Sequence, residues 1–334
     1  MHTSIQVENL TRVFNRRGTA PFHALQGVSF DVSYGEIFAL LGPNGAGKTT
    51  TIKIMSTLLL PTSGRVTVAG FDVERDYARV RPFISLISGG ETSGYGILRV
   101  EEQLWMFSQF YGMETPVAHS RIEHYLRMVG MWDDRHQQMN RLSTGMRQKV
   151  NLVRGLVTDP KVLFLDEPTL GVDVEASVII RGMVRDWVIE KPERSVILTT
   201  HYMAEADELC SRVAIINRGL ILANAAPSRL KQDLDSRAHY EITVDQINQE
   251  QVDSIATDMG EGNDFSLSSD KVTNNPMLAV HLTSEGGISR LIALLTEQSV
   301  SVEYMRKLEP TLEDVFLKMV GRRFEDEEQA APVS

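Results

Sequence analysis

The segment that decides the fold of this chain is Gly42-Pro43-Asn44-Gly45-Ala46-Gly47-Lys48-Thr49. The apolar residues 36–41 before it predict a strand, and the apolar residues 49–60 after it predict a helix that ends before Pro61. A glycine-rich loop in this position lets backbone N–H groups converge on phosphate oxygens, where the helix N-terminus adds positive potential. The pattern occurs by chance in only about 1% of chains of this length, so we interpret it as a phosphate-binding loop and not as an ordinary turn.

The side chains at the end of this loop have separate expected roles. Lys48 is expected to reach the β- and γ-phosphates of a nucleotide, and the Thr49 hydroxyl is expected to ligate Mg²⁺. Thr50 is expected to add a phosphate contact. The predicted nucleotide-binding residues here are Gly42, Pro43, Asn44, Gly45, Ala46, Gly47, Lys48, Thr49 and Thr50.

Two acidic residues end a second apolar segment. Residues 162–165 predict a buried strand, and Asp166 and Glu167 follow it directly. Open α/β sheets bind ligands at the carboxyl ends of their strands, so both side chains are expected beside the phosphate loop. We predict that Asp166 holds Mg²⁺, directly or through water, and that Glu167 acts as the general base for an attacking water. The alternative is that both acids simply end a strand.

The remaining pattern of the first two thirds predicts an α/β fold. Strands alternating with helices indicate a parallel-sheet core, preceded by a β-rich N-terminal subdomain. The strand signal disappears at about 91–157, where apolar positions have helical spacing, so we predict an inserted helical subdomain there. Further strands are expected at residues 5–10, 28–32, 65–69, 83–87, 196–199 and 213–216.

A second domain is expected after residue 227. Strand patterns at 240–244, 278–282 and 300–304 and a helix pattern at 288–297 predict a small α+β domain over 228–323. The first domain would then cover 1–227. The segment 324–334 contains Glu325, Asp326, Glu327 and Glu328 and is expected to be an acidic, disordered tail.

Composition excludes several classes of protein. The net charge of −10 argues against a nucleic-acid partner, because such proteins are usually basic. Cys210 is the only cysteine, so an intramolecular disulfide and a CxxC redox pair are impossible. No segment approaches the roughly 18 consecutive apolar residues of a membrane span, and no signal peptide is evident, so we expect a cytoplasmic location.

A further motif, Leu142-Ser143-Thr144-Gly145-Met146, precedes an amphipathic helix and would by itself be a good helix cap. Taken with the acids at 166–167, however, residues 142–173 resemble the ATP-binding cassette (ABC) family, whose signature usually reads LSGGQ. The resemblance extends from residue 4 to about 226. The string Glu309-Pro-Thr-Leu-Glu-Asp-Val-Phe316 resembles the type-2 exporters, which move drugs, lipids, polysaccharides or ions outward.

The resemblance implies a P-loop NTPase cassette that binds ATP with Mg²⁺ and hydrolyses it. Two copies would pack head to tail, so Ser143 and Gly145 of one copy would contact the γ-phosphate held by the other. Phe14 lies where an aromatic stacks on adenine, and His201 lies where the family has a histidine near the γ-phosphate. Residues 170–173 resemble a loop at the contact between copies.

The resemblance also implies a membrane partner. The chain would sit on the inner face of the cell membrane by binding a separately encoded permease. In the family, the helical subdomain forms a groove that receives a short permease helix. Its aromatic residues, most of which we expect in the core, are Tyr95, Trp105, Phe107, Phe110 and Tyr111.

The sequence departs from the family at one position. A glutamine that helps bind Mg²⁺ usually ends the strand predicted at 83–87, but Ser88, Gly89, Gly90 and Glu91 stand here instead. Either Glu91, Ser88 or a water supplies the oxygen, or Mg²⁺ binding relies more on Thr49 and Asp166.

Two alternative functions stay open. One is a soluble ABC ATPase without a transport role, although the chain has neither a coiled-coil insertion nor a second cassette. The other is a nucleotide-dependent regulator with little turnover. The missing glutamine slightly favours a regulator, whereas the retained Glu167 and His201 argue against it.

Overall fold

The structure is a computed structural model that describes residues 3–15, 18, 20–89, 95–234, 238–269, 275–284, 286–308 and 310–320. The chain divides into two units, Met1–Pro227 and Ser228–Ser334. Glu91, Glu309 and the acidic segment 324–334 lie outside the described residues. Within the described part, no helix combines the length and the apolar character that a membrane crossing requires.

The first unit is built on a sheet whose strands run in the order β10-β9-β3-β8-β7-β6. Pairing is parallel from β9 to β6, and β10 is antiparallel to β9. Every residue of β3, β7 and β8 is buried, as expected for a parallel sheet covered on both faces. The predicted α/β class with a parallel core is confirmed. The strands are β3 (Ile37–Leu41), β6 (Ile84–Ser88), β7 (Val162–Asp166), β8 (Ser195–Thr200), β9 (Arg212–Asn217) and β10 (Leu220–Ala225).

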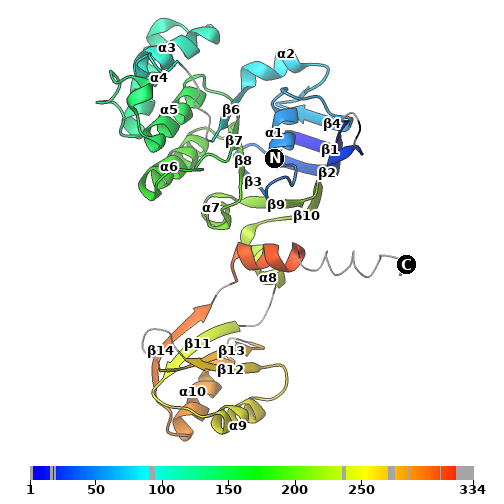
Figure 1. Ribbon diagram of the computed structural model, residues 1–334, viewed down its shortest axis with the longest axis vertical. Helices are drawn as coiled ribbons and strands as arrows, with labels where there is room; N and C mark the ends of the chain where they lie inside the picture. Colours follow the sequence, from blue (N-terminus) through cyan, green and yellow to red (C-terminus); the bar gives the residue numbers. More distant parts are fainter. Residues whose placement is uncertain are drawn as a thin grey trace. The chain divides into compact units, whose positions relative to one another are not determined.

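A smaller antiparallel sheet covers one side of this core (Figure 1). Its strands share a hydrophobic cluster with the central sheet and with α1 (Lys48–Met55), and the rings of Phe30 and Phe38 stack at 5.2 Å across the junction. Burial of this cluster ties the β-rich N-terminus to the phosphate loop. The strands are β1 (Thr3–Phe14), β2 (Phe22–Ser33), β4 (Ser63–Val68) and β5 (Phe71–Asp72).

The prediction of a helix through residue 60 is wrong, because α1 ends at Met55. Thr57 takes a left-handed φ of 63°, and the N–H of Leu58 donates to the Lys53 carbonyl at 2.8 Å. Leu58 and Leu60 are 63% and 60% exposed. The sequence prediction assumed that the whole segment 49–60 is buried as one helix, whereas the end of the segment is exposed.

Helices cover the other side of the central sheet (Figure 1). The helical layer comprises α3 (Val100–Phe110), α4 (Thr115–Met128) and α5 (Thr144–Val157), followed by α6 (Val174–Glu190). Pro116 lies in the first turn of α4, where a missing N–H costs no helical bond. Shorter helices are α2 (Tyr77–Val80) and α7 (Met203–Leu209).

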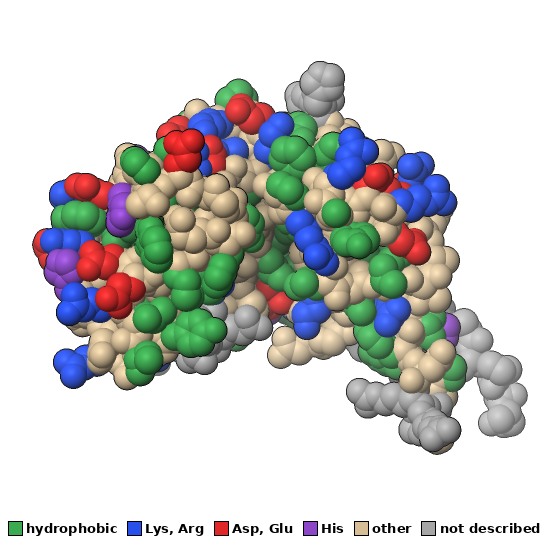
Figure 2. Space-filling view, turned by 90° about the horizontal axis from the view of Figure 1, so that it is seen from above, with side chains coloured by type: hydrophobic (Ala, Val, Ile, Leu, Met, Phe, Trp, Pro, Cys, Tyr) green, Lys and Arg blue, Asp and Glu red, His purple; other side chains and the backbone are tan. Residues whose placement is uncertain are grey.

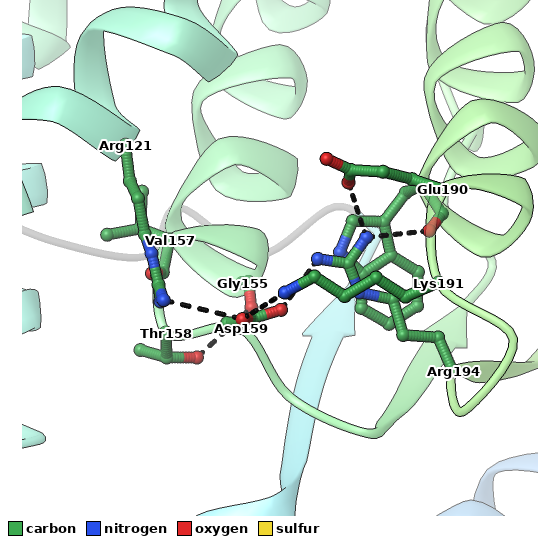
Figure 3. A network of polar contacts seen from close by, with 9 residues as sticks. Arg121, Gly155, Val157, Thr158, Asp159, Glu190, Lys191 and Arg194 are labelled. Atoms are coloured by element: carbon green, nitrogen blue, oxygen red, sulfur yellow. Dashed lines mark hydrogen bonds and ion pairs between the residues drawn. The ribbon is translucent and has the colours of Figure 1, made fainter.

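A charged network joins the helical layer to the sheet (Figure 3). Asp159, which follows α5, accepts hydrogen bonds from Lys191 at 2.7 Å and from Arg194 at 2.6 Å. Arg121 of α4 donates to the same carboxylate at 3.3 Å, and Arg194 also bonds Glu190 at 2.6 Å. Because Arg194 is only 2% exposed, its charge depends on these carboxylates for compensation.

The second unit contains a four-stranded antiparallel sheet in the order β12-β13-β11-β14. Helices α9 (Gln249–Met259) and α10 (Gly287–Glu297) pack on one of its faces and form the hydrophobic core with it. Residues 312–320 form a further helix that buries Leu312 and Val315, and α8 (Pro227–Leu234) spans the boundary between the units. The strands are β11 (Ala238–Val244), β12 (Asp264–Ser269), β13 (Pro276–Leu282) and β14 (Val302–Leu308).

We predict that Asp159→Asn lowers the free energy of unfolding by about 1–3 kcal/mol near neutral pH, because Arg194 and Lys191 lose a charged acceptor. Burial by itself would raise the pKa of Asp159, but the hydrogen bonds from Lys191 and Arg194 outweigh it and lower the pKa below 3.8. A depressed pKa stabilises the fold fully above the unfolded value, and this contribution is lost as pH falls through the folded value.

Urea unfolding at a series of pH values measures this effect. The difference between Asp159→Asn and the parent protein is expected to shrink below about pH 4. Asp133→Asn, at an exposed carboxylate of the same unit, is the matched control. Equal stability of the parent and Asp159→Asn at neutral pH would contradict the structural role of the network.

Candidate functional site

The phosphate loop packs closely against β2 and β9. A side chain at Gly42 would place its Cβ 2.2 Å from the Ile216 carbonyl oxygen. Gly47 has a φ of 111°, and a Cβ there would lie 2.8 Å from the Ala24 carbonyl oxygen. The N–H of Gly219 also donates to the Ala46 carbonyl at 2.9 Å. Close packing therefore requires glycine at positions 42 and 47, independently of phosphate.

A cavity of about 210 Å³ opens above the loop. Lys48 is the first residue of α1, so the positive end of the helix dipole faces this cavity. The structure brings most of the predicted nucleotide-binding residues together with Glu167, and it adds two residues from β2 that sequence reasoning missed. The lining is Phe22, Ala24, Pro43, Asn44, Gly45, Gly47, Lys48, Thr49, Thr50 and Glu167.

Phe14 is not part of this lining. It pairs with Phe22 in the register of β1 and β2, and the Arg12 guanidinium lies 4.6 Å from the centroid of its ring. Phe22 is 56% exposed and does line the cavity. Phe22 is the first residue of β2, which is separated from the loop by β3, and no motif in the sequence marks it as a site residue.

Lys48 is buried within the site. Its Nζ donates to the carbonyl oxygens of Gly42 at 2.6 Å and Pro43 at 3.3 Å. The same nitrogen lies 3.3 Å from Glu167 Oε1, and the Lys48 side chain is 6% exposed. A shielded cation at this point attracts the negative charge of a triphosphate more strongly than an exposed one would.

Asp166 joins three elements. Its Oδ1 accepts a hydrogen bond from Thr49 at 3.1 Å and one from Thr199 of β8 at 2.6 Å. The carboxylate and the Thr49 hydroxyl are adjacent hard oxygen donors, which is the chemistry that Mg²⁺ requires, so these residues fit the ion. Thr199 was not predicted, although a polar residue in an otherwise apolar strand beside Asp166 is a usable signal.

Glu167 and His201 meet at the carboxyl ends of β7 and β8. His201 Nδ1 lies 2.8 Å from Glu167 Oε2. Glu167 has a φ of 53°, which costs about 1–3 kcal/mol for a residue other than glycine. Its N–H donates to the Thr199 carbonyl at 3.0 Å, so neighbouring bonds maintain this conformation. A carboxylate placed between a lysine and a histidine at a phosphate site can accept a proton from water.

The structure leaves no room for a side chain at Gly89. The Gly89 N–H donates to the Asp166 carbonyl at 2.7 Å, and a Cβ at this position would lie 1.8 Å from the Glu167 carbonyl oxygen. No side chain fits there with β6 and β7 so arranged. Ser88 pairs with Asp166 in the parallel register, whereas Glu91 lies outside the described residues.

Ser143 and Gly145 are separate from the cavity. Ser143 caps α5, and its Oγ accepts a hydrogen bond from the Met146 N–H at 3.2 Å. A Cβ on Gly145 would lie 3.0 Å from Asp173 Oδ2, at the start of α6. The structure does not bring these residues to the phosphate loop of the same chain, since none of them lines its cavity.

Known proteins resemble this chain in sequence and in structure. A family model described as ABC transporter matches residues 25–170. The chain is 30% identical over 322 residues to the linearmycin resistance ATP-binding protein LnrL of Bacillus subtilis (strain 168), covering 96% of this chain and all (100%) of LnrL. It is 32% identical over 305 residues to the daunorubicin resistance ATP-binding protein DrrA2 of Streptomyces coeruleorubidus, covering 91% and 92%. A solved ATP binding subunit of an ABC transporter superimposes with a TM-score of 0.61 and 26% identity over 69% of this chain and 92% of the subunit.

We predict that Gly89→Ala lowers the rate at which this chain hydrolyses nucleoside triphosphate by at least about tenfold, because the added methyl displaces the backbone of Glu167. Steady-state hydrolysis and thermal unfolding measure the effect. Gly182→Ala, where a Cβ on α6 meets no atom within 4 Å, is the control and is expected to behave like the parent. Normal turnover in Gly89→Ala would show that β6 and β7 can separate without cost.

Proposed function

This chain belongs to the ATP-binding proteins of ABC transporters and hydrolyses ATP, and we propose that two copies share their ATP sites and drive export through a separate membrane permease. The observation that carries this proposal is the Glu167 carboxylate, which lies between Lys48 and His201 beside the phosphate loop. The alternatives of a soluble non-transport ATPase or a regulator are not favoured, because the similar proteins are named for drug resistance.

Hydrolysis is assigned to residues at the carboxyl edge of the sheet. Glu167 accepts a proton from the attacking water, and His201 holds the carboxylate and contacts the γ-phosphate. Lys48 binds the β- and γ-phosphates. Thr49 and Asp166 would hold Mg²⁺, which would compensate the phosphate charge.

A second copy completes each site. The exposed Ser143 and the adjacent Gly145 would contact the γ-phosphate bound by the partner copy, and Phe14 or Phe22 would stack on the adenine. Apolar residues at the start of α6 support a contact surface there, since Val174 and Val178 are 82% and 52% exposed. Leu170, which precedes them, is 41% exposed. Burial of these side chains favours association of two copies.

The permease contact is assigned to a groove of about 730 Å³ between the helical layer and the end of α1. Figure 2 shows a hollow in this face with hydrophobic side chains along its edges. Phe110 and Tyr111 on one side are 70% and 52% exposed, and Leu58 on the other is 63% exposed. The lining contains Arg81 and Arg154 but no acidic residue. An amphipathic permease helix with an acidic side chain fits this surface.

The proposed cargo is a drug-like molecule. Linearmycin and daunorubicin resistance are the functions named for two similar proteins, each matched over more than nine tenths of its length. Because the cassette supplies the energy and the permease supplies the path, the cargo contacts the partner and not this chain.

We predict that Glu167→Gln retains ATP binding but lowers hydrolysis by about 10²- to 10⁴-fold, because the amide cannot accept the proton of the attacking water. A closed dimer with trapped ATP is expected, and size-exclusion chromatography with nucleotide analysis measures it. Glu175→Gln, at an exposed position on α6, is the control. Turnover within twofold of the parent, on the order of experimental scatter, would remove Glu167 from catalysis.

We predict that Phe110→Asp disrupts the complex with the permease, because a carboxylate replaces an exposed apolar contact in the groove. Hydrolysis by the isolated chain is expected to remain normal, while co-purification with the permease and ATP-driven transport are lost. Ile189→Asp changes an apolar residue of α6 that is 73% exposed but outside the groove, and it should transport normally. Normal co-purification of Phe110→Asp would contradict the assignment of this groove.

A further inference from the structure

Glu205 on α7 lies outside the phosphate cavity but contacts both segments that carry the catalytic pair. Its Oε2 accepts a hydrogen bond from Thr169 Oγ1 at 2.8 Å and one from Thr200 Oγ1 at 3.3 Å. Thr169 follows Glu167 by two residues, and Thr200 immediately precedes His201. One carboxylate oxygen therefore links the turn after β7 to the end of β8.

The second oxygen of Glu205 ties the same residue to α6. Its Oε1 accepts a hydrogen bond from Ser177 at 3.2 Å and lies 3.5 Å from Arg181. The Glu205 side chain is 13% exposed, so these partners replace most of its contact with water. Four side chains from three segments thus converge on one largely buried carboxylate, an arrangement that restricts the position of each segment.

The contacts of Glu205 restrain the strained backbone at Glu167. Its left-handed φ of 53° persists only when the surrounding structure holds the backbone. Upstream, Asp166 is bonded to Thr49 and Thr199. Downstream, the bond from Thr169, which is 6% exposed, to Glu205 restrains the turn. Release of the downstream bond would let the backbone relax and move the Glu167 carboxylate away from His201.

We propose that Glu205 is a positioning residue for ATP hydrolysis, which holds Glu167 and His201 at their 2.8 Å separation without touching the nucleotide. This inference rests on the proposed catalytic roles of Glu167 and His201. It assigns to α7 a part in catalysis that the motifs around the phosphate loop do not include. Arg181 keeps a second carboxylate, Glu208, at 3.1 Å, so removal of Glu205 does not leave this guanidinium uncompensated.

The test compares Glu205→Gln with Glu208→Gln in the full chain. In Glu205→Gln an NH2 group, which donates and cannot accept, replaces one of the two accepting oxygens, and kcat is expected to fall about tenfold to a hundredfold because the catalytic carboxylate is displaced. KM and the affinity for ATP are expected to stay within about twofold, since no nucleotide contact is removed. Glu208, on the same helix and also paired with Arg181, is 52% exposed, and Glu208→Gln should keep the parental kcat.

Variants at Thr169 separate positioning from a general structural role. Thr169→Val removes the hydroxyl that donates to Glu205 and should lower kcat similarly, whereas Thr169→Ser retains a hydroxyl and should restore it. Addition of Glu205→Gln to Glu167→Gln should cause a much smaller loss than Glu205→Gln causes alone, because the Glu167–His201 pair through which Glu205 acts is already altered.

Three results would overturn the proposal: unchanged kcat in Glu205→Gln, equal losses in Glu205→Gln and Glu208→Gln, or independent losses in the double variant. Near-normal turnover of Glu167→Gln alone would instead refute the proposed catalytic role of Glu167. That outcome is distinguishable, since it concerns the single variant without any change at Glu205.

Discussion

The bonds from Thr49 and Thr199 to Asp166 are the interaction on which the site depends. They connect the first turn of α1, the end of β7 and the end of β8 through a single carboxylate oxygen. Asp166 is 9% exposed, and a carboxylate at that depth is costly unless it is paired or hydrogen-bonded. The same oxygen atoms suit Mg²⁺, so the group that stabilises this edge of the sheet also belongs to the chemistry of ATP.

Backbone packing beside Asp166 determines which side chains can enter the site. β6 approaches β7 so closely that Gly89 cannot carry a Cβ, and Glu167 adopts a left-handed conformation next to it. This close approach excludes a side chain at position 89, next to the Glu167–His201 contact. Strain at Glu167 is retained because bonds from neighbouring segments oppose its relaxation.

Two carboxylates outside the cavity, Glu205 and Asp159, connect further segments of the first unit. Glu205 connects the turns around Glu167 and His201 with α6. Asp159 connects the helical layer with the segment between α6 and β8, and it directly follows Thr158, which lines the groove assigned to the permease.

Much of the fold and of the site is predictable from local sequence. The phosphate loop, the acids after residue 165 and His201 each follow an apolar strand, and the parallel-sheet rule places such residues at one edge. Interactions between distant segments are not predictable in this way. Phe22 at the cavity and the steric exclusion at Gly89 each depend on a neighbour from another part of the chain.

By itself, the sequence determined the family, the α/β class and the chemistry of the phosphate loop, because glycine, lysine and carboxylate patterns act through local geometry. Tertiary structure alone decided that Ser143 lies apart from its own loop, that Thr199 shares Asp166 with Thr49, and that Glu205 joins the two catalytic segments. Each of these facts depends on distances between strands and helices, which arise only when the hydrophobic core brings distant segments together.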